Sequence, residues 1–354
     1  MVNLLKDYGG IKMRCVAIGD MFLDESDFRK EIEKSNLFDS YKGFNWKRDL
    51  NRVKTRELIR KIETVGSEAY LLSDEIKDAI QEADVVFVHL CPIGKEVIQN
   101  AKNLKYIVSV RGGLENIAVK EAKEKGIHVI HCPAHNAHAV AEFTVGLIIC
   151  ETRNIARANY ALKQGEWREK YPNSGKINEL RSSSVGIIGF GTIGRLVVEL
   201  LRPFNTTIYV SDPFVSKGEI QKAGCIASSK ENLLRKADIV TLHGRIGPND
   251  PPIIGKNELA LMKPTAYLIN TARAVLVDMD ALIYSLETNQ IMGAAIDVFR
   301  KEPLDDNDPI TKLDNITITN HRGGDTVDSY TRSPELVIEY LKEALKTGNT
   351  RYML

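Results

Sequence analysis

The sequence predicts an α/β protein built on parallel β-sheets. Short runs rich in valine, isoleucine and leucine alternate with longer amphipathic stretches along almost the whole chain, and such alternation favours parallel strands joined by helical crossovers. The runs are continuously apolar, which is typical of strands covered by helices on both faces. A length of 354 residues suggests roughly two domains.

The strand-like runs form two series. Helical patterns separate the members of each series, and the pattern over 116–126 closes on a glycine, as a helix end should. The first series comprises 15–18, 68–72, 85–90, 106–110 and 128–131. The second comprises 184–189, 207–212, 238–243, 266–270, 293–298 and 316–319.

A long helical pattern over 136–165 separates the two series. Its first half is unusually apolar, with Val140, Phe143 and Leu147 at helical spacing. The pattern fits a helix at a domain or subunit contact, and it fits a plain core helix equally well. After Gly323 the chain has one more amphipathic helix, which a proline interrupts.

The composition is that of a soluble globular protein. The net charge is +1, so there is no basic footprint for nucleic acid or an anionic membrane. No apolar run approaches the roughly 20 residues that cross a bilayer, and the N-terminal stretch lacks a basic region followed by an apolar block. The five cysteines show no CxxC spacing, which indicates buried thiols in a reducing cytosol. We therefore expect a cytoplasmic protein without nucleic-acid, membrane or metal partners.

The stretch VGIIGFGTIGR places Gly189, Gly191 and Gly194 in G-x-G-x-x-G spacing between a strand and a helix. The first glycine permits a tight turn, the second lets a pyrophosphate approach the backbone, and the third lets the helix pack on the strand. The N–H groups of Thr192 and Ile193 then lie at the positive end of the helix. This context predicts a dinucleotide-binding loop.

Asp212, at the end of the next strand, fits the ribose of that dinucleotide. Its carboxylate would accept hydrogen bonds from the ribose hydroxyls and repel a 2′-phosphate. The residues that follow, PFVSK, include no arginine, so we expect NAD rather than NADP. The alternative is a glycine turn with an unrelated aspartate.

Four polar residues follow later strands: Arg273, Asp297, Glu302 and His321. Ligands bind at the carboxyl ends of parallel strands, so these side chains are expected to share one crevice. Reduction of a keto acid needs a cation for the carboxylate and carbonyl, which arginine supplies. It also needs a proton donor, which histidine supplies, and a nearby carboxylate favours the imidazolium form. Taken singly, each residue also fits a surface arginine, a solvated acid or a turn histidine.

The chain resembles the D-isomer-specific 2-hydroxyacid dehydrogenases, the family that includes D-3-phosphoglycerate, glycerate, formate and D-lactate dehydrogenases. The resemblance rests on VGIIGFGTIGR, on LMKPTAYLINTARAVLVDMDALIYSLETNQIMGAAIDVFRKEPL and on TITNHRGGDT. A looser match begins at GLENIAVKEAKEKG and ends at AVAEFTVGLI. The resemblance implies an NAD-dependent oxidoreductase that transfers a hydride between nicotinamide and a D-2-hydroxy acid or 2-keto acid.

The resemblance also assigns roles to single residues. Arg273 binds the substrate carboxylate and carbonyl, His321 is the acid/base, and Glu302 tunes His321. In the turn VRGGLEN, two glycine N–H groups hold the substrate carboxylate. The expected substrate-binding residues are Arg111, Gly112 and Gly113. The expected cofactor contacts are Gly189, Gly191, Thr192, Ile193, Gly194, Asp212, His243, Thr271, Ala272, Asp297, Gly323 and Gly324.

The family implies how the chain divides. An NAD-binding Rossmann domain, residues 133–324, is inserted into a flavodoxin-like substrate domain made of 1–132 and 325–354. Homodimers built on the cofactor domains and the long helix are usual in the family, and Gly323 and Gly324 are expected near a hinge. Because the chain ends shortly after His321, we expect no C-terminal regulatory domain.

Several positions depart from the family pattern. Ala274 replaces the glycine that commonly follows the arginine, and Asn320 replaces the proline usual before the histidine. Arg111, Arg245 and Arg322 are each either solvated cations or substrate contacts. If two of them line the cleft, the substrate carries charge beyond its carboxylate, as in a phosphorylated or sugar-derived acid.

A second function fits the same scaffold. The family also resembles transcriptional corepressors, so a non-catalytic, dinucleotide-sensing binding protein is the alternative to an enzyme. Retention of Arg273, Glu302 and His321 favours the enzyme.

Overall fold

The computed structural model describes residues 13–247 and 250–354, and it contains two parallel sheets, as the sequence predicts. The chain divides into two compact units. Unit 1 comprises Met1–Asn136 and Thr326–Leu354, and unit 2 comprises Ala137–Asp325. Within the described residues no helix is long and apolar enough to span a membrane.

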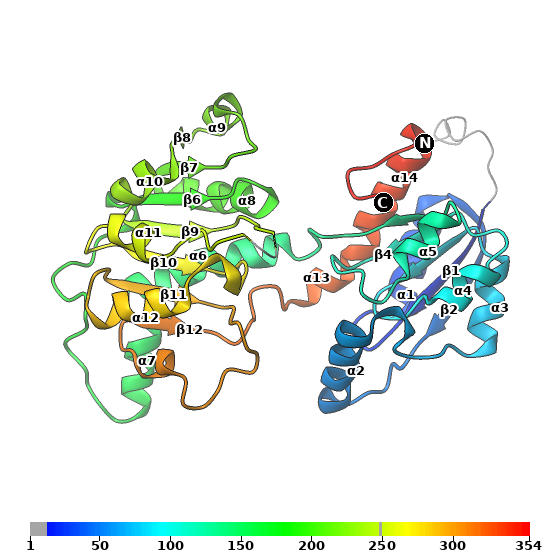
Figure 1. The fold of residues 1–354 in the computed structure, drawn as a ribbon, viewed down its shortest axis with the longest axis horizontal. Coiled ribbons are helices and arrows are strands. Elements are labelled where there is room, and N and C mark those ends of the chain that lie inside the picture. The colour runs from blue at the N-terminus through cyan, green and yellow to red at the C-terminus, as the bar shows by residue number, and fades with distance from the viewer. Residues whose placement is uncertain (1–12, 248–249) are drawn as a thin grey trace. The chain divides into compact units, whose positions relative to one another are not determined.

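Unit 1 is built on a five-stranded sheet of order β2-β1-β3-β4-β5, of which β1, β2 and β4 are labelled in Figure 1. The chain leaves β1 for the edge at β2 and then crosses back to β3, so the strand order reverses between β1 and β3, where such sheets bind ligands. The strands are β1 (Met13–Gly19), β2 (Phe38–Asn45), β3 (Val85–Val88), β4 (Tyr106–Ser109) and β5 (His128–Ile130). The helices are α1 (Glu25–Ser35), α2 (Arg52–Val65), α3 (Asp74–Glu82), α4 (Lys95–Asn100), α5 (Val119–Glu124), α13 (Val327–Thr331) and α14 (Ser333–Thr347).

Helices cover both faces of the unit 1 sheet. α2, α3, α4 and α5 bury apolar side chains against one face, and α1 and α14 do so against the other. In α14, Val337 and Leu341 are fully buried beside Phe28 and Phe87. Burial of one such side chain contributes about 1.5–3 kcal/mol, so the return of the chain to unit 1 completes its core.

The sheet of unit 1 differs from prediction at its edge. The expected strand over 68–72 is wrong: Glu68 ends a short 3-10 helix (Gly66–Glu68), and the rest of the segment leads irregularly into α3. Leu72 is buried but Leu71 is 83% exposed, so the run is not covered on both faces. The edge position beside β1 belongs to β2, whose sequence FDSYKGFN is too polar to indicate a buried strand.

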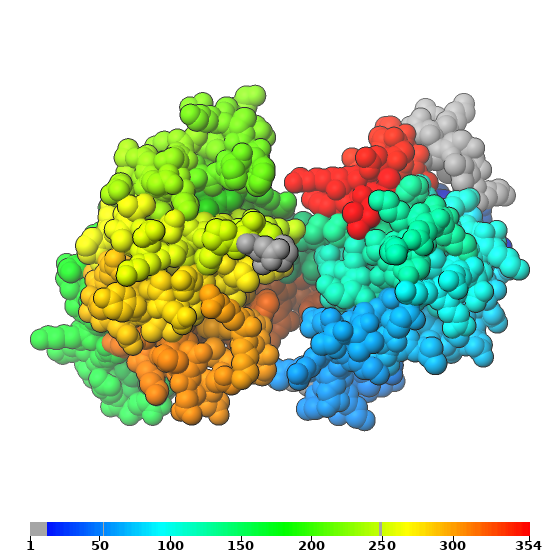
Figure 2. All heavy atoms as spheres, in the orientation of Figure 1, coloured from blue at the N-terminus to red at the C-terminus, as the bar shows by residue number. Residues whose placement is uncertain are grey.

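Unit 2 is built on a seven-stranded sheet of order β12-β11-β10-β9-β6-β7-β8. Its atoms change from green through yellow to orange along the chain (Figure 2). The strands are β6 (Ser184–Ile188), β7 (Thr207–Ser211), β8 (Ile226–Ala227), β9 (Ile239–Leu242), β10 (Tyr267–Asn270), β11 (Gly293–Ile296) and β12 (Ile316–Ile318). The helices are α6 (Ala137–Thr152), α7 (Ile155–Lys163), α8 (Thr192–Leu201), α9 (Lys217–Lys222), α10 (Lys230–Lys236), α11 (Lys256–Leu261) and α12 (Met279–Glu287). Short 3-10 helices are Leu180–Ser182, Arg202–Phe204, Ala274–Leu276 and Pro309–Lys312.

Two apolar clusters cover the two faces of this sheet. α10, α11 and α12 pack on one face, and α6, α8 and α9 pack on the other. Every residue of β9, β10 and β11 is buried, which explains their continuously apolar sequences. The order reverses between β6 and β9, so unit 2 is a doubly wound sheet with its ligand-binding crevice expected beside β6.

The helix predicted over 136–165 is two helices, so that prediction is wrong in its middle. α6 and α7 are separated at Asn154, whose φ of 56° is left-handed. Asparagine tolerates this conformation better than most residues do. The Asn154 amide donates to Asn173 Oδ1 at 2.7 Å and accepts from Arg157 Nη1 at 3.3 Å, so these two side chains hold the break.

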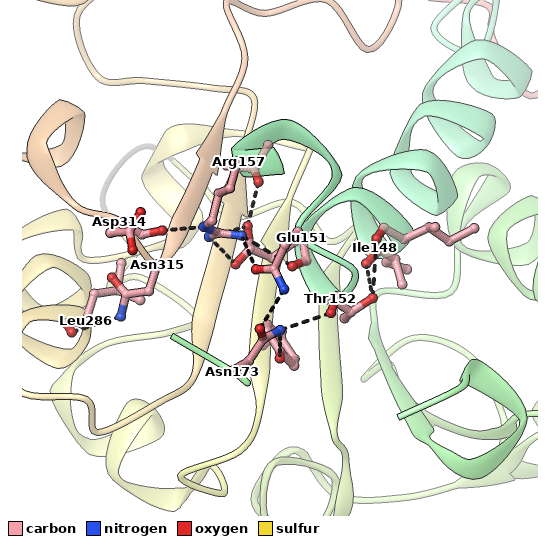
Figure 3. A network of polar contacts seen from close by, with 12 residues as sticks. Ile148, Glu151, Thr152, Arg157, Asn173, Leu286, Asp314 and Asn315 are labelled. Carbon is pink, nitrogen blue, oxygen red and sulfur yellow. Dashed lines mark hydrogen bonds and ion pairs between the residues drawn. The ribbon is translucent and has the colours of Figure 1, made fainter. Parts of the chain in front are cut away.

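A buried ion pair between Glu151 and Arg157 joins α6, α7 and β12 (Figure 3). Arg157 Nη2 donates to both carboxylate oxygens of Glu151, at 2.8 and 3.0 Å, and the Thr317 hydroxyl donates to Glu151 Oε2 at 2.6 Å. Arg157 Nε donates to the backbone carbonyl of Asp314. Glu151 is 1% exposed and Arg157 is 9% exposed. Loss of either partner would leave a buried charge without compensation.

We expect Glu151→Gln to lower the free energy of unfolding of unit 2 by about 3–5 kcal/mol, because Arg157 stays buried without its counter-charge. Denaturant unfolding measures this loss. The control is Asp305→Asn, which removes the exposed pair between Asp305 and Lys301 (63% and 71% exposed side chains) and should cost no more than about 1 kcal/mol. Equal losses in the two variants would contradict a structural role for the buried pair.

Candidate active site

The glycine loop after β6 has the geometry that a dinucleotide needs. Gly189 has a φ of +97°, and a Cβ there would collide with the backbone of His243 and Gly244. A Cβ at Gly194 would collide with the carbonyl of Gly189, so α8 packs directly on the loop. At Gly191 a Cβ would meet open space. The loop therefore fits a dinucleotide. Protein backbone lies close to Gly189 and Gly194, whereas Gly191 leaves room for a pyrophosphate.

Asp212 holds this loop from the next strand. Its Oδ2 accepts from the N–H of Phe190 at 2.6 Å, and its Oδ1 accepts from the N–H of Phe214 at 2.8 Å. The first N–H groups of an α-helix have no acceptor within the helix, so those of Thr192 and Ile193 are available to an anion beside Gly191. The partly exposed carboxylate of Asp212 keeps lone pairs for ribose hydroxyls.

Two predicted cofactor contacts have partners inside the protein. The Thr271 hydroxyl lies 2.7 Å from the Thr144 hydroxyl of α6. His243 follows β9, and its Nε2 lies 3.0 Å from the Thr241 hydroxyl. The Nδ1 of His243 is buried and has no hydrogen-bond partner among the described residues, so its hydrogen-bonding capacity is unmet. Burial lowers the pKa of His243 to about 4, which keeps its imidazole neutral at physiological pH.

This lowered pKa predicts a pH-dependent stability. The unfolded state binds a proton near the ordinary histidine pKa of about 6.5, whereas the folded state resists protonation down to about pH 4. Stability therefore falls as the pH drops through this window, by roughly 3 kcal/mol in total. Denaturant unfolding at several pH values should show a steeper loss for the wild type than for His243→Gln. Parallel curves for the two proteins would contradict the buried, neutral imidazole.

His321 and Glu302 form a hydrogen-bonded pair beyond β12 and β11. His321 Nδ1 lies 2.8 Å from Glu302 Oε2, and Glu302 Oε1 accepts from the N–H of Phe299 at 3.0 Å. Because a carboxylate accepts, the proton on this bond belongs to Nδ1. The side chain of His321 is 52% exposed, so its Nε2 is free to exchange a proton with a substrate.

Asp297 fixes the turn that carries His321. This aspartate is 1% exposed. Its Oδ1 accepts from the Thr319 hydroxyl at 2.6 Å and from the Arg322 N–H at 2.8 Å, and its Oδ2 accepts from the Gly323 N–H at 2.9 Å. His321 has a φ of +57°, an uncommon conformation that persists where the surroundings impose it. The turn is thus held without the family's proline.

Arg273 follows β10 and carries no acidic partner among the described residues. Its side chain is exposed, and its Nη1 donates to the carbonyl of Ala272 at 2.7 Å. Asn270 braces the turn, because its amide donates to the carbonyl of Arg273 at 2.9 Å and accepts from the N–H of Ala272 at 3.1 Å. Ala274 has no positive φ, so the absence of glycine there costs nothing. The guanidinium fork is available to a carboxylate.

The other arginines differ in their surroundings. Arg322 forms an ion pair with Asp325, and Gly324 lies between these two residues. Arg245 is exposed and has no ion-pair partner in the described part of the chain. In unit 1, Arg111 is largely buried and lies 3.4 Å from Glu115 through Nη2, whereas its buried Nη1 has no partner among the described residues.

The turn after β4 presents the predicted carboxylate-binding glycines. Gly112 packs on Pro133, and its carbonyl lies 2.9 Å from His131 Nδ1. No acceptor for the N–H groups of Gly112 and Gly113 occurs among the described residues. Sequence analysis missed a carboxylate–histidine pair in unit 1, Asp20 and His89. Each residue directly follows an apolar strand, and that position was the signal that could have identified the pair.

Comparison with known proteins gives the family. Residues 145–323 match the family model described as D-isomer specific 2-hydroxyacid dehydrogenase, NAD binding domain. The chain is 37% identical over 279 residues to a D-3-phosphoglycerate dehydrogenase of Methanocaldococcus jannaschii, covering 78% of this chain and 52% of that protein. It is 34% identical over 298 residues to a hydroxypyruvate reductase of Thermotoga maritima, covering 83% and 95%. The chain thus spans about half of the first relative and nearly all of the second.

A solved structure shares the fold. The NAD-complexed D-isomer specific 2-hydroxyacid dehydrogenase of Lactobacillus delbrueckii ssp. bulgaricus has a TM-score of 0.76 at 23% identity, over 96% of this chain and 99% of that one. The predicted fold class, family and cofactor are confirmed. The chain belongs to the D-isomer-specific 2-hydroxyacid dehydrogenases, and its residues 145–323 form the NAD-binding domain of that family.

Proposed function

We propose that this chain is an NAD-dependent dehydrogenase that interconverts a D-2-hydroxy acid and its 2-keto acid. The observation that carries the proposal is the 2.8 Å bond between His321 Nδ1 and Glu302, which leaves Nε2 exposed on the family's NAD-binding domain. Arg273, an exposed arginine without an acidic partner among the described residues, follows a neighbouring strand of the same sheet. Proton donor and carboxylate-binding cation are the two protein groups that the reaction needs.

In the direction of reduction, the Arg273 fork binds the substrate carboxylate and polarises the keto carbonyl. The hydride for C2 comes from the bound nicotinamide. His321 Nε2–H donates its proton to the oxygen as negative charge develops there, and Glu302 holds the imidazole through Nδ1–H. The product is the 2-hydroxy acid, and the reverse reaction uses neutral His321 as the base. Asp297 orients His321 by holding the backbone of its turn.

The two predicted domains have separate tasks in this proposal. Residues 133–324 bind NAD through the glycine loop, Asp212 and the turns that follow β9, β10 and β12. Residues 1–132 and 325–354 form the substrate domain, where Arg111 and the N–H groups of Gly112 and Gly113, which have no acceptor among the described residues, bind the acid. The relatives named for D-3-phosphoglycerate and hydroxypyruvate favour a short hydroxy acid, and the buried Arg111 Nη1 favours one with a further negative charge.

We also propose a homodimer that forms through unit 2. Helix α7 and the segment that follows it expose four large apolar side chains: Ile155 (51%), Tyr160 (68%), Leu162 (56%) and Trp167 (80%). Apolar side chains gathered in this way are typical of subunit interfaces. Light scattering should give twice the monomer mass for the wild type and less for Trp167→Glu. A wild-type monomer would contradict the proposal.

The cytoplasm remains our proposed location.

Purified protein with NADH and a panel of 2-keto acids tests the function. We expect NADH oxidation that depends on the keto acid, and chiral analysis of the product should give the D-hydroxy acid. NADH binding without turnover of any acid, together with nucleotide-dependent association with a protein partner, would instead favour the dinucleotide-sensing alternative.

A further inference from the structure

The strand that leads into the turn of His321 is β12, which lies at one end of the unit 2 sheet. It has three residues, Ile316–Ile318, and pairs with β11 along its whole length. Glu302 follows β11, so the 2.8 Å between His321 Nδ1 and Glu302 Oε2 depends on how β12 lies along β11. A short strand that is paired on one side opens more readily than a central strand. Its position therefore needs support from side chains.

Side chains along β12 supply part of that support. The Thr317 hydroxyl donates to Glu151 Oε2 of α6 at 2.6 Å, and the Asn315 amide donates to the Leu286 carbonyl of α12 at 3.0 Å. Asn315 and Thr317 are both 6% exposed. Beyond the strand, Asp297 holds the turn that follows it. These contacts fix the middle and the carboxyl end of β12, and its amino end is held separately.

Asp314, two residues before β12, is held through both its main chain and its side chain. Arg157 of α7 donates through Nε to its backbone carbonyl (Figure 3). Arg168, from the irregular segment that follows α7, donates through Nη1 to Oδ1 at 2.8 Å and through Nη2 to Oδ2 at 2.5 Å. Two parallel N–H···O bonds of this kind combine opposite charge with a fixed geometry. The amino end of β12 is thus tied to two arginines.

The guanidinium of Arg168 is itself held in place. Its Nε donates to the Lys170 carbonyl at 2.9 Å, and its central carbon lies 4.7 Å from the centre of the Tyr171 ring. The Arg168 side chain is 24% exposed. Hydrogen bonding from Arg168 lowers the pKa of Asp314, which favours the charged carboxylate. Most ion pairs near the surface contribute little to stability, whereas a two-pronged pair within a network is an exception.

We propose that Arg168 and Asp314 are positioning residues for His321. Their ion pair fixes the start of β12, so that the end of the strand presents the imidazole to Glu302. The inference rests on the proposed dehydrogenase function, and every contact that carries it lies within unit 2. Without the ion pair, β12 keeps its contacts to β11, to α6 and to Asp297, so the unit stays folded while the end of the strand samples more positions. Proton transfer becomes slower with such displacement, because the donor must lie within hydrogen-bond reach of the substrate oxygen.

Steady-state kinetics of the full chain, with NADH and a keto acid that it reduces, test this role. We expect Arg168→Gln and Asp314→Asn each to lower kcat by about 3- to 10-fold, a fraction of the roughly 10²-fold loss that a displacement of about 1 Å can cause. KM for the keto acid and Kd for NADH should stay unchanged, because neither residue binds them. Arg168→Lys keeps the charge but not the planar fork, so it should recover part of the loss. A wild-type kcat in both Arg168→Gln and Asp314→Asn would overturn the proposal.

Arg235→Gln is the matched control, because Arg235 is an exposed arginine of α10 in the same unit. Its kcat should match that of the wild type. Denaturant unfolding of all the variants gives the folded fraction under the conditions of the assay. A loss of kcat that disappears once it is corrected for the folded fraction would show a purely structural role and would also overturn the proposal.

Proton NMR of the chain with labelled histidine reads the site without turnover. The Nδ1–H of His321 donates to a carboxylate, so its resonance should lie downfield and be absent from His321→Ala. We expect this resonance to shift or broaden in Arg168→Gln and Asp314→Asn but not in Arg235→Gln, because the hydrogen bond to Glu302 loosens. An unchanged resonance in both variants would contradict the positioning role. If the wild type reduces none of the acids, the proposed function fails, and the resonance still decides whether the ion pair positions His321.

Discussion

His321→Ala lowers kcat for keto-acid reduction by about 10²- to 10⁴-fold, the range that one well-placed proton donor contributes. The reason is the geometry of its pair with Glu302, in which Nδ1 is engaged at 2.8 Å and Nε2 is exposed. Steady-state kinetics at neutral pH measure the loss. Titration of NADH fluorescence should give a Kd close to that of the wild type, because the phosphate-binding loop after β6 is unchanged.

His128→Gln controls for the loss of an exposed histidine at the start of β5 in unit 1, and its kcat should match the wild type. Substitution of Glu302 by Gln should give an intermediate loss, since the imidazole remains but its orienting carboxylate does not. A His321→Ala enzyme within threefold of wild-type kcat would refute the assignment of the proton donor.

Arg273→Ala lowers kcat/KM by about 10²-fold or more, because two charge-assisted hydrogen bonds to one carboxylate are each worth about 1.5–3 kcal/mol. The loss should appear in both kcat and KM, since the same guanidinium binds the carboxylate and polarises the carbonyl. Arg273→Lys should recover only part of the activity, because a lysine keeps the charge but not the planar fork. Kinetics with a single keto acid over a wide concentration range separate the two parameters.

Arg235→Ala is the matched control, since Arg235 is an exposed arginine in the last turn of α10 and should leave the kinetics unchanged. An Arg273→Ala enzyme with an unaltered KM and a kcat near that of the wild type would place the carboxylate elsewhere.

Parallel strands covered on both faces could be predicted from the sequence, because each is a continuous apolar run. The edge strand β2 could not be predicted in this way. Its side chains are less buried than those of a central strand, and its sequence FDSYKGFN is not a continuous apolar run. The division of the long helix at Asn154 also escaped it. That break depends on Asn173 and Arg157, which are contacts in space rather than a pattern along the chain.

The candidate site shows the same limit. The positions of Arg273, Glu302 and His321 after successive strands could be predicted, since the carboxyl ends of parallel strands meet at one edge. The role of Asp297 in holding this turn could not be predicted, because its three hydrogen bonds to residues 319–323 depend on the folded backbone. Asp20 and His89 are 69 positions apart, and only the adjacency of β1 and β3 brings them together.

Transfer of deuterium from NADH labelled at C4 of the nicotinamide tests the central claim most directly. With a 2-keto acid that the enzyme accepts, we predict a D-2-hydroxy acid with one deuterium at C2 and none on exchangeable positions, detected by mass spectrometry and chiral chromatography. His321→Ala should form the labelled product more slowly, by the same factor of about 10²- to 10⁴-fold that its kcat falls. Recovery of unreacted keto acid with bound nucleotide, or an L-product, would contradict the account.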